Sequence, residues 1–310
     1  MRVLVTGNLG YIGPVIVRRL LEAGHYVIGA DTGWYVHQYA GDPVWPDVQH
    51  FADIRHPRDS MFEGIGAIVH LAGLSNDPIG DLDPAVTEDI NLSGTLGMLT
   101  PGIRNLVVSS CSVYGANDTV ATEATLPNAQ TTYAKCKADV DRFLDSGLWP
   151  YEDWVSLRLG TVYGYSPGHR LDLVVNKMTF DALARGHVTA SGNAWRPLTH
   201  VEDVADAVLF FLTRGQGVYN IVGENRQMND LAREVGRFAD VPVVLKATTG
   251  DTRNYRASGD RAAFAGWTPA HTVAGSLPAL FKRTLDLPAG RIYERLPIAR
   301  RHLDKEPVAA

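Results

Sequence analysis

Short apolar runs alternate with segments of helical spacing along the first half of the chain. Four continuous apolar runs, typical of strands that are covered on both faces, are residues 3–5, 26–30, 67–71 and 106–109. Residues 14–23 (PVIVRRLLEA) and 84–99 have the pattern of helices, and Pro14 stands where an early helical position tolerates proline. Strands separated by helical crossovers predict an α/β fold with a doubly wound parallel sheet.

The first strand leads into VTGNLGYIG, in which Gly7, Gly10 and Gly13 are spaced by three. Between a strand and a helix, this spacing allows a tight turn, a close approach to a pyrophosphate and a helix N-terminus that faces the anion. Asp31, at the end of the second strand, can accept hydrogen bonds from ribose hydroxyls and would repel a 2′-phosphate. The pattern predicts a Rossmann-type sheet that binds NAD rather than NADP. The alternatives are a turn without a ligand and, for Asp31, the start of a turn.

Tyr133 and Lys137 stand four residues apart in a helical segment, YAKCKADVDRFL, and therefore project from one face. A free tyrosine has a pKa of about 10, so a base at neutral pH needs a shift of about 3 units. One nearby cation supplies about 1 to 3 units, and a positive nicotinamide ring can supply the rest. Tyr133 would then take a proton from a substrate hydroxyl while the carbon gives hydride to the cofactor, and Ser110 would bond the same oxygen. The alternatives are a surface pair for Tyr133 and Lys137 and a cap for Ser110.

The glycine spacing resembles that of the extended short-chain dehydrogenase/reductase family. Further motifs resemble that family in the same order along the chain, namely Asp53-Ile54, His70-Leu71-Ala72-Gly73, Asn91, SSCSVYG (109–115) and YAKCK (133–137). The resemblance extends through RLGTVYG (158–164), WRPLTHVEDVADAV (195–208) and VYNIVG (218–223), and so covers nearly the whole chain.

Within that family, the chain is similar to the nucleotide-sugar epimerases and dehydratases. This resemblance implies NAD as the cofactor and a nucleotide-diphosphate sugar as the substrate. The cofactor-binding residues that it implies are Gly7, Gly10, Tyr11, Ile12, Gly13, Asp31, Asp53, Ile54, Leu71, Ala72, Gly73, Asn91, Ser109, Tyr133 and Lys137, with Asn91 as the structural asparagine of the family.

The tripeptide Ser110-Cys111-Ser112 bears on the reaction. The 4,6-dehydratases of the family carry Thr-Asp-Glu there, and both carboxyl groups are missing in this chain. We therefore expect epimerisation at C4 through a transient 4-keto sugar, with Tyr133, Lys137 and Ser110 as the catalytic residues. A ketoreductase or dehydrogenase, a 4,6-dehydratase-like enzyme and a non-catalytic dinucleotide-sensing protein remain as alternatives. Cys111 is expected to be a small buried residue, with an acid–base role as the second interpretation, and Ser112 is the neighbouring candidate to Ser110.

The second half is expected to build a smaller, discontinuous substrate-binding lobe. Residues 171–186 read as a helix that carries Asn176, while 201–212 and 218–221 read as a helix and a strand that return to the first domain. The predicted domains are 1–165 plus 200–222, which bind the dinucleotide, and 166–199 plus 223–310, which bind the nucleotide sugar. The predicted substrate-binding residues are Ser75, Asn176, Arg196, Arg253 and Tyr255. Arg196 and Arg253 suit a diphosphate because guanidinium groups meet phosphate oxygens bidentately, although each also fits an ordinary surface arginine.

Composition limits the remaining classes. The chain has 310 residues, a net charge of −5 and a pI of about 6.0, which give no basic field for a nucleic-acid partner. No apolar run is long enough to span a bilayer, and the first apolar residues are too few for a signal-peptide core. Cys111 and Cys136 cannot form a disulfide framework, and the histidines lack metal-ligand spacing. We expect a cytoplasmic enzyme without a protein-held metal or a membrane role, and a homodimer as the default assembly. The family resemblance implies the helices near 84–99 and 133–146 as its interface, although Pro101-Gly102 ends the first of them early.

Overall fold

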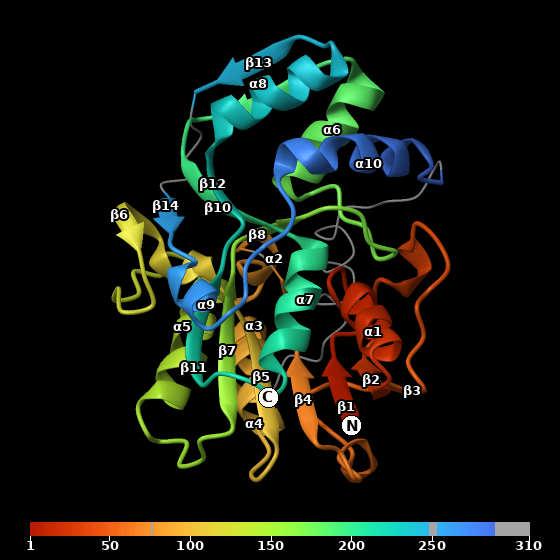
Figure 1. The fold of residues 1–310 in the computed structure, drawn as a ribbon, viewed down its shortest axis with the longest axis vertical. Helices are drawn as coiled ribbons and strands as arrows, with labels where there is room; N and C mark the ends of the chain where they lie inside the picture. Colours follow the sequence, from red (N-terminus) through yellow and green to blue (C-terminus); the bar gives the residue numbers. More distant parts are fainter. Residues whose placement is uncertain (76, 248–252, 289–310) are drawn as a thin grey trace.

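A parallel seven-stranded sheet forms the centre of the molecule (Figure 1). The computed structural model describes residues 1–75, 77–247 and 253–288, so the end of the predicted second lobe, 289–310, lies outside the described residues. In sheet order, the strands are β11 (Gly217–Ile221), β7 (Trp154–Leu159), β5 (Arg104–Ser110), β4 (Ala67–His70), β1 (Arg2–Thr6), β2 (Tyr26–Asp31) and β3 (Val48–Phe51). The predicted doubly wound parallel sheet is confirmed, with β3 and β7 added to the predicted strands.

The positions of the side chains of β1 explain why three successive residues of this strand, Val3 to Val5, are all apolar. Val3 and Val5 point into a core shared with helices α1 (Gly13–Glu22) and α7 (Val201–Phe211), whereas Leu4 points into a second core on the opposite face. All three side chains are fully buried, because helices cover both faces of the sheet. The strand therefore lacks the polar alternation that one solvated face would produce.

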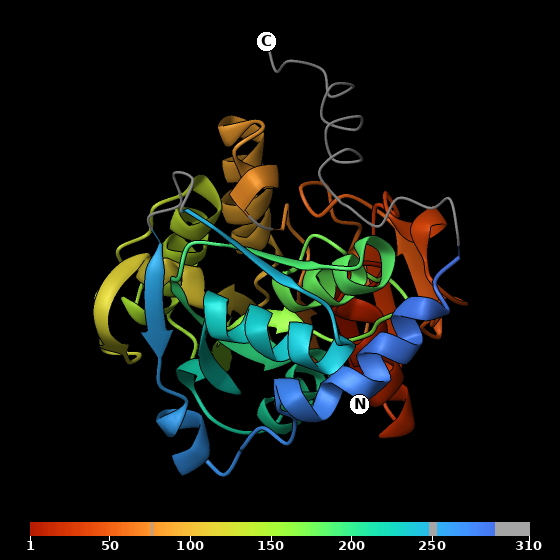
Figure 2. The same ribbon diagram turned by 90° about the horizontal axis from the view of Figure 1, so that it is seen from above.

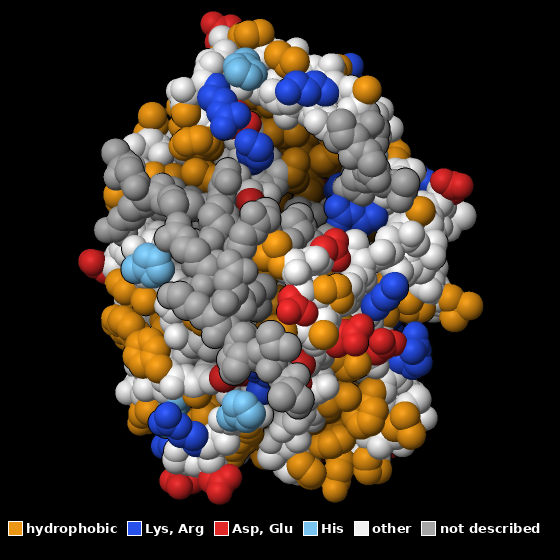
Figure 3. Space-filling view, turned by 180° about the vertical axis from the view of Figure 1, so that it is seen from behind, with side chains coloured by type: hydrophobic (Ala, Val, Ile, Leu, Met, Phe, Trp, Pro, Cys, Tyr) orange, Lys and Arg blue, Asp and Glu red, His pale blue; other side chains and the backbone are white. Residues whose placement is uncertain are grey.

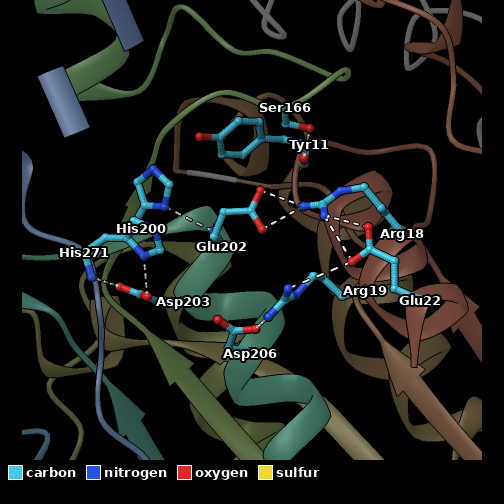
Figure 4. A network of polar contacts seen from close by, with 10 residues as sticks. All are labelled: Tyr11, Arg18, Arg19, Glu22, Ser166, His200, Glu202, Asp203, Asp206 and His271. Atoms are coloured by element: carbon cyan, nitrogen blue, oxygen red, sulfur yellow. Dashed lines mark hydrogen bonds and ion pairs between the residues drawn. The ribbon is translucent and has the colours of Figure 1, made fainter. Parts of the chain in front are cut away.

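Helices α1 and α7 pack side by side on one face of the sheet, and ion pairs join their outer sides (Figure 4). Arg18 on α1 bonds both Glu202 on α7, at 2.7 Å, and Glu22 on its own helix, at 3.0 Å. Arg19 pairs with Asp206 one turn further along α7. Helix α7 follows the second-half strands in sequence, so these contacts tie that part of the chain to the helix that begins at the glycine turn.

The predicted helix at 84–99 is divided into three parts. It comprises α3 (Pro84–Glu88), a π-helical turn η3 (Asp89–Gly94) and α4 (Thr95–Met98). Asn91 lies in the π-helical turn, and both atoms of its amide bond the backbone of Leu74, at 2.7 and 3.0 Å. The extra residue in the turn thus coincides with the asparagine that holds the loop after β4. Such turns are frequent near functional sites.

The second half of the chain adds a smaller part at the carboxyl ends of the strands. Helices α6 (Val174–Arg185), α8 (Met228–Ala239) and α10 (Val273–Leu285) gather there around their own apolar core (Figures 1 and 2). The predicted helix at 171–186 thus begins at Val174. The predicted return of 201–212 and 218–221 is confirmed, since β11 pairs with β7 in the central sheet. The residue boundaries of the two domains stay a prediction.

Small sheets and short helices complete the fold. The sheets are β8 (Thr161–Tyr163), β10 (Trp195–His200) and β12 (Glu224–Gln227); β9 (Val188–Ser191) with β13 (Val243–Lys246); and β6 (Ala116–Ala121) with β14 (Asn254–Ala257). The helices are α2 (Asp77–Gly80), α5 (Thr132–Asp145), α9 (Asp260–Phe264) and the 3₁₀ turns η1 (Val36–Gln38), η2 (Asp59–Met61) and η4 (Cys111–Tyr114).

Two buried histidines, His70 and His169, and the partly buried His200 make the stability of the fold sensitive to acid. Burial lowers the pKa of His70 to about 3 and the pKa of His169 and of His200 to about 4. Between pH 6.5 and 4 these histidines are protonated in the unfolded chain but not in the folded chain, so the free energy of unfolding falls as the pH falls. Together they lower the free energy of unfolding by up to about 4 kcal/mol for each pH unit. Urea unfolding at pH 7, 5.5 and 4.5 measures the loss.

A matched pair of histidine variants separates this effect from that of the carboxyl groups. His169→Gln removes one buried imidazole and is expected to weaken the pH dependence, whereas His56→Gln changes an exposed side chain and should leave it as in the wild type. Equal slopes in His169→Gln and wild type would contradict the assignment.

Candidate active site

A cavity of about 1050 Å³ opens at the carboxyl ends of the central strands. Its lining combines the glycine turn after β1, the ends of β2, β4 and β5, the start of α5 and segments of the smaller part of the molecule. Ligands of open α/β sheets bind at this edge. In the view from behind, a hollow in the upper half of the molecule is bordered by hydrophobic side chains and by Lys or Arg side chains (Figure 3).

The glycine turn leaves a cradle that side chains would fill. Gly7 has φ +70°, and a Cβ atom there would lie 2.7 Å from the backbone nitrogen of Ala72. A Cβ atom on Gly13, the first residue of α1, would lie 2.5 Å from the Cα atom of Asn8. Gly7, Gly10 and Gly13 all line the cavity. The backbone thus comes close to the cavity beside the N-terminus of α1, and these residues fit the diphosphate of a dinucleotide.

The acidic side chain at the end of β2 lies at one end of this cavity. The carboxylate oxygens of Asp31 accept hydrogen bonds from the backbone N–H groups of Leu9, at 3.1 Å, and Gly33, at 2.8 Å. These two bonds fix the carboxylate beside the glycine turn. Asp53 and Ile54 line the same end, so the residues predicted for the adenosine half of a dinucleotide lie together.

Helix α5 brings the predicted catalytic groups to the cavity. Thr131 caps the helix, with its side chain accepting the N–H of Ala134, so Tyr133 stands in the first turn. Tyr133 is hydrogen-bonded to the side chain of Ser110 at the end of β5. The ammonium of Lys137 lies 6.0 Å from the centre of the Tyr133 ring and donates to the carbonyl of Val108 at 2.8 Å. All three predicted catalytic residues line the cavity.

The charges around Tyr133 differ from those expected. Burial raises the pKa of Tyr133, and the hydrogen bond from Ser110 and the charge of Arg170 oppose this rise. Burial lowers the pKa of Lys137 to about 8, against the nearby carboxylate of Asp141. Arg170 thus adds a positive charge near the phenol that the sequence did not predict, while the ammonium of Lys137 is bonded to the backbone. Bound NAD⁺ would add a second positive charge to this site and supply the hydride acceptor.

Cys111 and Ser112 take different positions. Cys111 is 1% exposed, lies outside the cavity lining and directs its thiol toward the carbonyl of Arg158 at 3.3 Å. Burial raises the pKa of this thiol. The structure therefore corrects the acid–base interpretation of Cys111 in favour of packing. Ser112 lines the cavity, and its hydroxyl oxygen is buried without a hydrogen-bond partner among the described residues.

The far end of the cavity contains the residues predicted to bind the substrate. Arg196 and Arg253 both line it, and Arg196 donates to the backbone carbonyl of Arg253 at 2.6 Å. The Arg196 guanidinium lies 5.4 Å from the centre of the Tyr255 ring, which also lines the cavity. Two guanidinium groups beside an aromatic ring suit a nucleoside diphosphate. The structure brings these residues together, while their contact with a substrate stays a prediction.

Two predicted binding residues lie outside the lining and support it from behind. Asn176 is fully buried; its amide accepts the N–H of Gly164 and donates to the Tyr11 hydroxyl and the Arg170 carbonyl. Asn91 is also fully buried and holds Leu74 from the π-helical turn. The side-chain amides of Asn176 and Asn91 both bond groups of the protein itself. The substrate role of Asn176 and the direct cofactor role of Asn91 are therefore corrected to positioning roles. The structural role expected of Asn91 agrees with these contacts.

Arg170 and Asp172 line the cavity and were missed in the sequence. Arg170 is 5% exposed, forms a bidentate ion pair with Asp172 and bonds the hydroxyl of Ser75 at 3.1 Å. The sequence signal was the charged pair in RLD, at the start of the predicted helix at 171–186. Nothing in that local pattern placed the pair beside Tyr133.

Neither a metal site nor a membrane span appears in the part of the chain that the structure describes. There, no three His, Cys, Asp or Glu side chains group so as to hold a metal ion. Within the same residues, every helix is too short or too polar to cross a bilayer.

Residues 3–222 match the model of the NAD dependent epimerase/dehydratase family. The chain belongs to this family. A relative, the UDP-glucose 4-epimerase of Lacticaseibacillus casei, is 28% identical over 307 residues, which cover 87% of this chain and 92% of that enzyme. NAD is the cofactor of the family, so the predicted family, fold class and cofactor are confirmed.

Solved structures resemble the chain over most of its length. The UDP-glucose 4-epimerase of Thermus thermophilus in complex with NAD is 25% identical, with a TM-score of 0.78, and the match covers 92% of this chain and 99% of that one. The NAD-dependent NDP-hexosamine 5,6-dehydratase TunA reaches a TM-score of 0.82 at 21% identity, covering 93% of this chain and 100% of that one, which shows a shared fold. The fold thus serves more than one reaction, and the reaction must be argued from the site.

Proposed function

We propose that the protein epimerises a nucleotide-diphosphate sugar at C4 through a transient 4-keto intermediate. Tyr133 removes the proton from the C4 hydroxyl. Ser110 bonds the same oxygen, and Lys137 and Arg170 provide positive charge around it. NAD, when bound at the glycine turn, would accept hydride from C4 and return it to the other face of the keto sugar, so the coenzyme would be unchanged overall.

The observation that carries this proposal is the set of acidic groups in the cavity. Among the described residues that line it, Asp31, Asp53 and Asp172 carry carboxylates. Asp31 and Asp53 lie at the adenosine end, and Asp172 is paired with Arg170 at 2.7 Å. Elimination of water needs an acid and a base besides the tyrosine that takes the hydroxyl proton, and the Thr-Asp-Glu of the 4,6-dehydratases supplies them. Epimerisation needs neither, and the similarity to UDP-glucose 4-epimerases supports it further.

The alternatives make different demands on the coenzyme. A ketoreductase or dehydrogenase would use the same tyrosine, lysine and serine but would exchange its coenzyme at every turnover. A dinucleotide-sensing protein without turnover would have no need for a phenol hydrogen-bonded to a serine inside the cavity. A homodimer and a cytoplasmic location remain predictions that accompany the proposed activity.

Incubation of the purified protein with UDP-, TDP-, GDP- and CDP-hexoses in D₂O, without added coenzyme, tests the reaction. We expect C4 isomers to interconvert with no net NADH formation and no deuterium in the ring, because hydride returns to the carbon that it left. Loss of water or deuterium at C3 or C5 would contradict C4 epimerisation, and so would stoichiometric consumption of NADH in a parallel sample to which NADH is added. The Tyr133→Phe variant serves as the control for contaminating activity.

A further inference from the structure

Arg170 is a buried cation with hydrogen-bonding capacity left over. Its side chain lines the cavity although the residue is only 5% exposed. Nε and Nη2 donate to Asp172 at 2.9 and 2.7 Å, and Nη1 donates to Ser75 at 3.1 Å. A guanidinium has five N–H groups, so these contacts with described residues leave two of them. A buried donor beside a cavity, without a partner for each N–H, is suited to a ligand.

The segment that carries Arg170, residues 164–172, packs directly on the glycine turn; we call it the strap. Ser166 donates its hydroxyl to the backbone carbonyl of Tyr11 at 2.5 Å, and the two residues lie next to each other in Figure 4. Gly168 approaches so closely that a Cβ atom there would lie 2.1 Å from the carbonyl oxygen of Gly10. The backbone of Ala40 donates to the carbonyl of Pro167 at 2.7 Å. The strap therefore contacts the phosphate-binding turn at Gly10 and Tyr11, and it also bonds the segment after β2 at Ala40.

The charge of Arg170 acts on a tyrosine of the glycine turn and on the catalytic tyrosine. It opposes the burial-induced rise in the pKa of Tyr11, which belongs to the glycine turn, and in that of Tyr133. The guanidinium thus lies within electrostatic reach of the phosphate-binding turn and of the catalytic phenol. Asp172 holds it in a fixed orientation through a bidentate pair, which reduces the entropy lost when an anion binds.

We propose that Arg170 binds the diphosphate of NAD beside the glycine turn, and that the strap thereby retains the coenzyme between turnovers. The coenzyme diphosphate is favoured over that of the sugar nucleotide because the strap contacts Gly10 and Tyr11. Arg196 and Arg253, in contrast, lie together with Tyr255 on β10 and at the start of β14, in segments separate from the strap and the glycine turn. Guanidinium groups bind phosphate oxygens through paired N–H groups, which a lysine cannot reproduce. This role depends on the NAD dependence of the family and not on which sugar carbon is inverted.

Binding of NADH, ADP-ribose and UDP to Arg170→Gln, without any sugar turnover, tests the role. We expect the affinity for both NADH and ADP-ribose to fall by about 10- to 100-fold, equivalent to about 1.4 to 2.8 kcal/mol, with UDP binding unchanged. The purified variant should also retain less coenzyme. Arg196→Gln is the crossed control and should weaken UDP while leaving ADP-ribose unchanged.

Any other pattern of affinities would overturn the assignment of Arg170 to the coenzyme diphosphate. Loss of UDP affinity alone would place Arg170 at the sugar nucleotide, and loss confined to NADH would place it at the nicotinamide rather than the diphosphate. Unchanged affinities would leave it a structural ion pair. If Arg170→Gln does not fold, Arg170→Lys keeps the positive charge but not the fork, and must still weaken ADP-ribose. Failure of C4 epimerisation in the sugar panel would leave all these binding results untouched.

Discussion

Replacement of Tyr133 by phenylalanine is expected to lower kcat by about 10²- to 10⁴-fold, the contribution typical of general acid–base catalysis. The phenol is the group of the cavity that is hydrogen-bonded to Ser110 and faces the charge of Arg170. Its removal leaves the glycine turn and the arginines at the far end in place. NADH and UDP should therefore bind the variant as they bind the wild type, and the loss should appear in kcat rather than in KM.

Stopped-flow and steady-state measurement of C4 isomer exchange, with NADH binding followed by fluorescence, gives these values. Tyr26→Phe is a matched control, because Tyr26 lies on β2 with a 39% exposed side chain and does not line the cavity. It should retain wild-type kcat. A Tyr133→Phe variant with more than a tenth of the wild-type kcat would remove the tyrosine from the catalytic role.

The strands that the sequence predicted are those whose residues are apolar on both faces. β1, β2, β4 and β5 read clearly because helices cover both sides of the sheet there. β7 was missed as a strand because its run WVSLRL is interrupted by Ser156 and Arg158, although both are buried. Both side chains bond the carboxylate of Asp141 on α5, which the local sequence of the strand does not reveal. β3 was missed because it is a half-exposed edge strand with little apolar pattern.

Some residues of the site could likewise be predicted from short sequence spacings, whereas others depend on contacts between distant segments. The glycine turn and the pair Tyr133 and Lys137 could be predicted because their meaning lies in short spacings after a strand or along one helix face. Asn176 was assigned to the substrate from the family resemblance, and the sequence could not show that its side chain points into the protein. Arg170 was missed because its place beside Tyr133 depends on how the strap crosses the glycine turn. Side-chain direction and long-range approach are fixed only by tertiary packing.

A buried ion pair lies beneath the catalytic helix. Asp141 on α5, one turn after Lys137, is 2% exposed and accepts a hydrogen bond from Arg158 on β7 at 2.7 Å. It also accepts the hydroxyls of Ser156, at 2.6 Å, and Ser109, at 3.1 Å. Ser109 lines the cavity, so the carboxylate links α5, β5 and β7 directly under the site. It also supports the charged form of Lys137 against burial, raising a pKa that desolvation lowers.

Asp141→Asn is therefore expected to destabilise the protein by about 3 to 5 kcal/mol, because it leaves the buried guanidinium of Arg158 without its counter-charge. The cost arises from desolvation: the asparagine still accepts hydrogen bonds but no longer balances the charge. Asp139→Asn, on the same helix, is the matched control. Its partner Arg142 is 69% exposed, and an exposed pair contributes about 0.2 to 1 kcal/mol. Urea unfolding of both variants at pH 7 measures the difference, and similar free energies of unfolding in the two would show that Asp141 is not the ionic support of the catalytic helix.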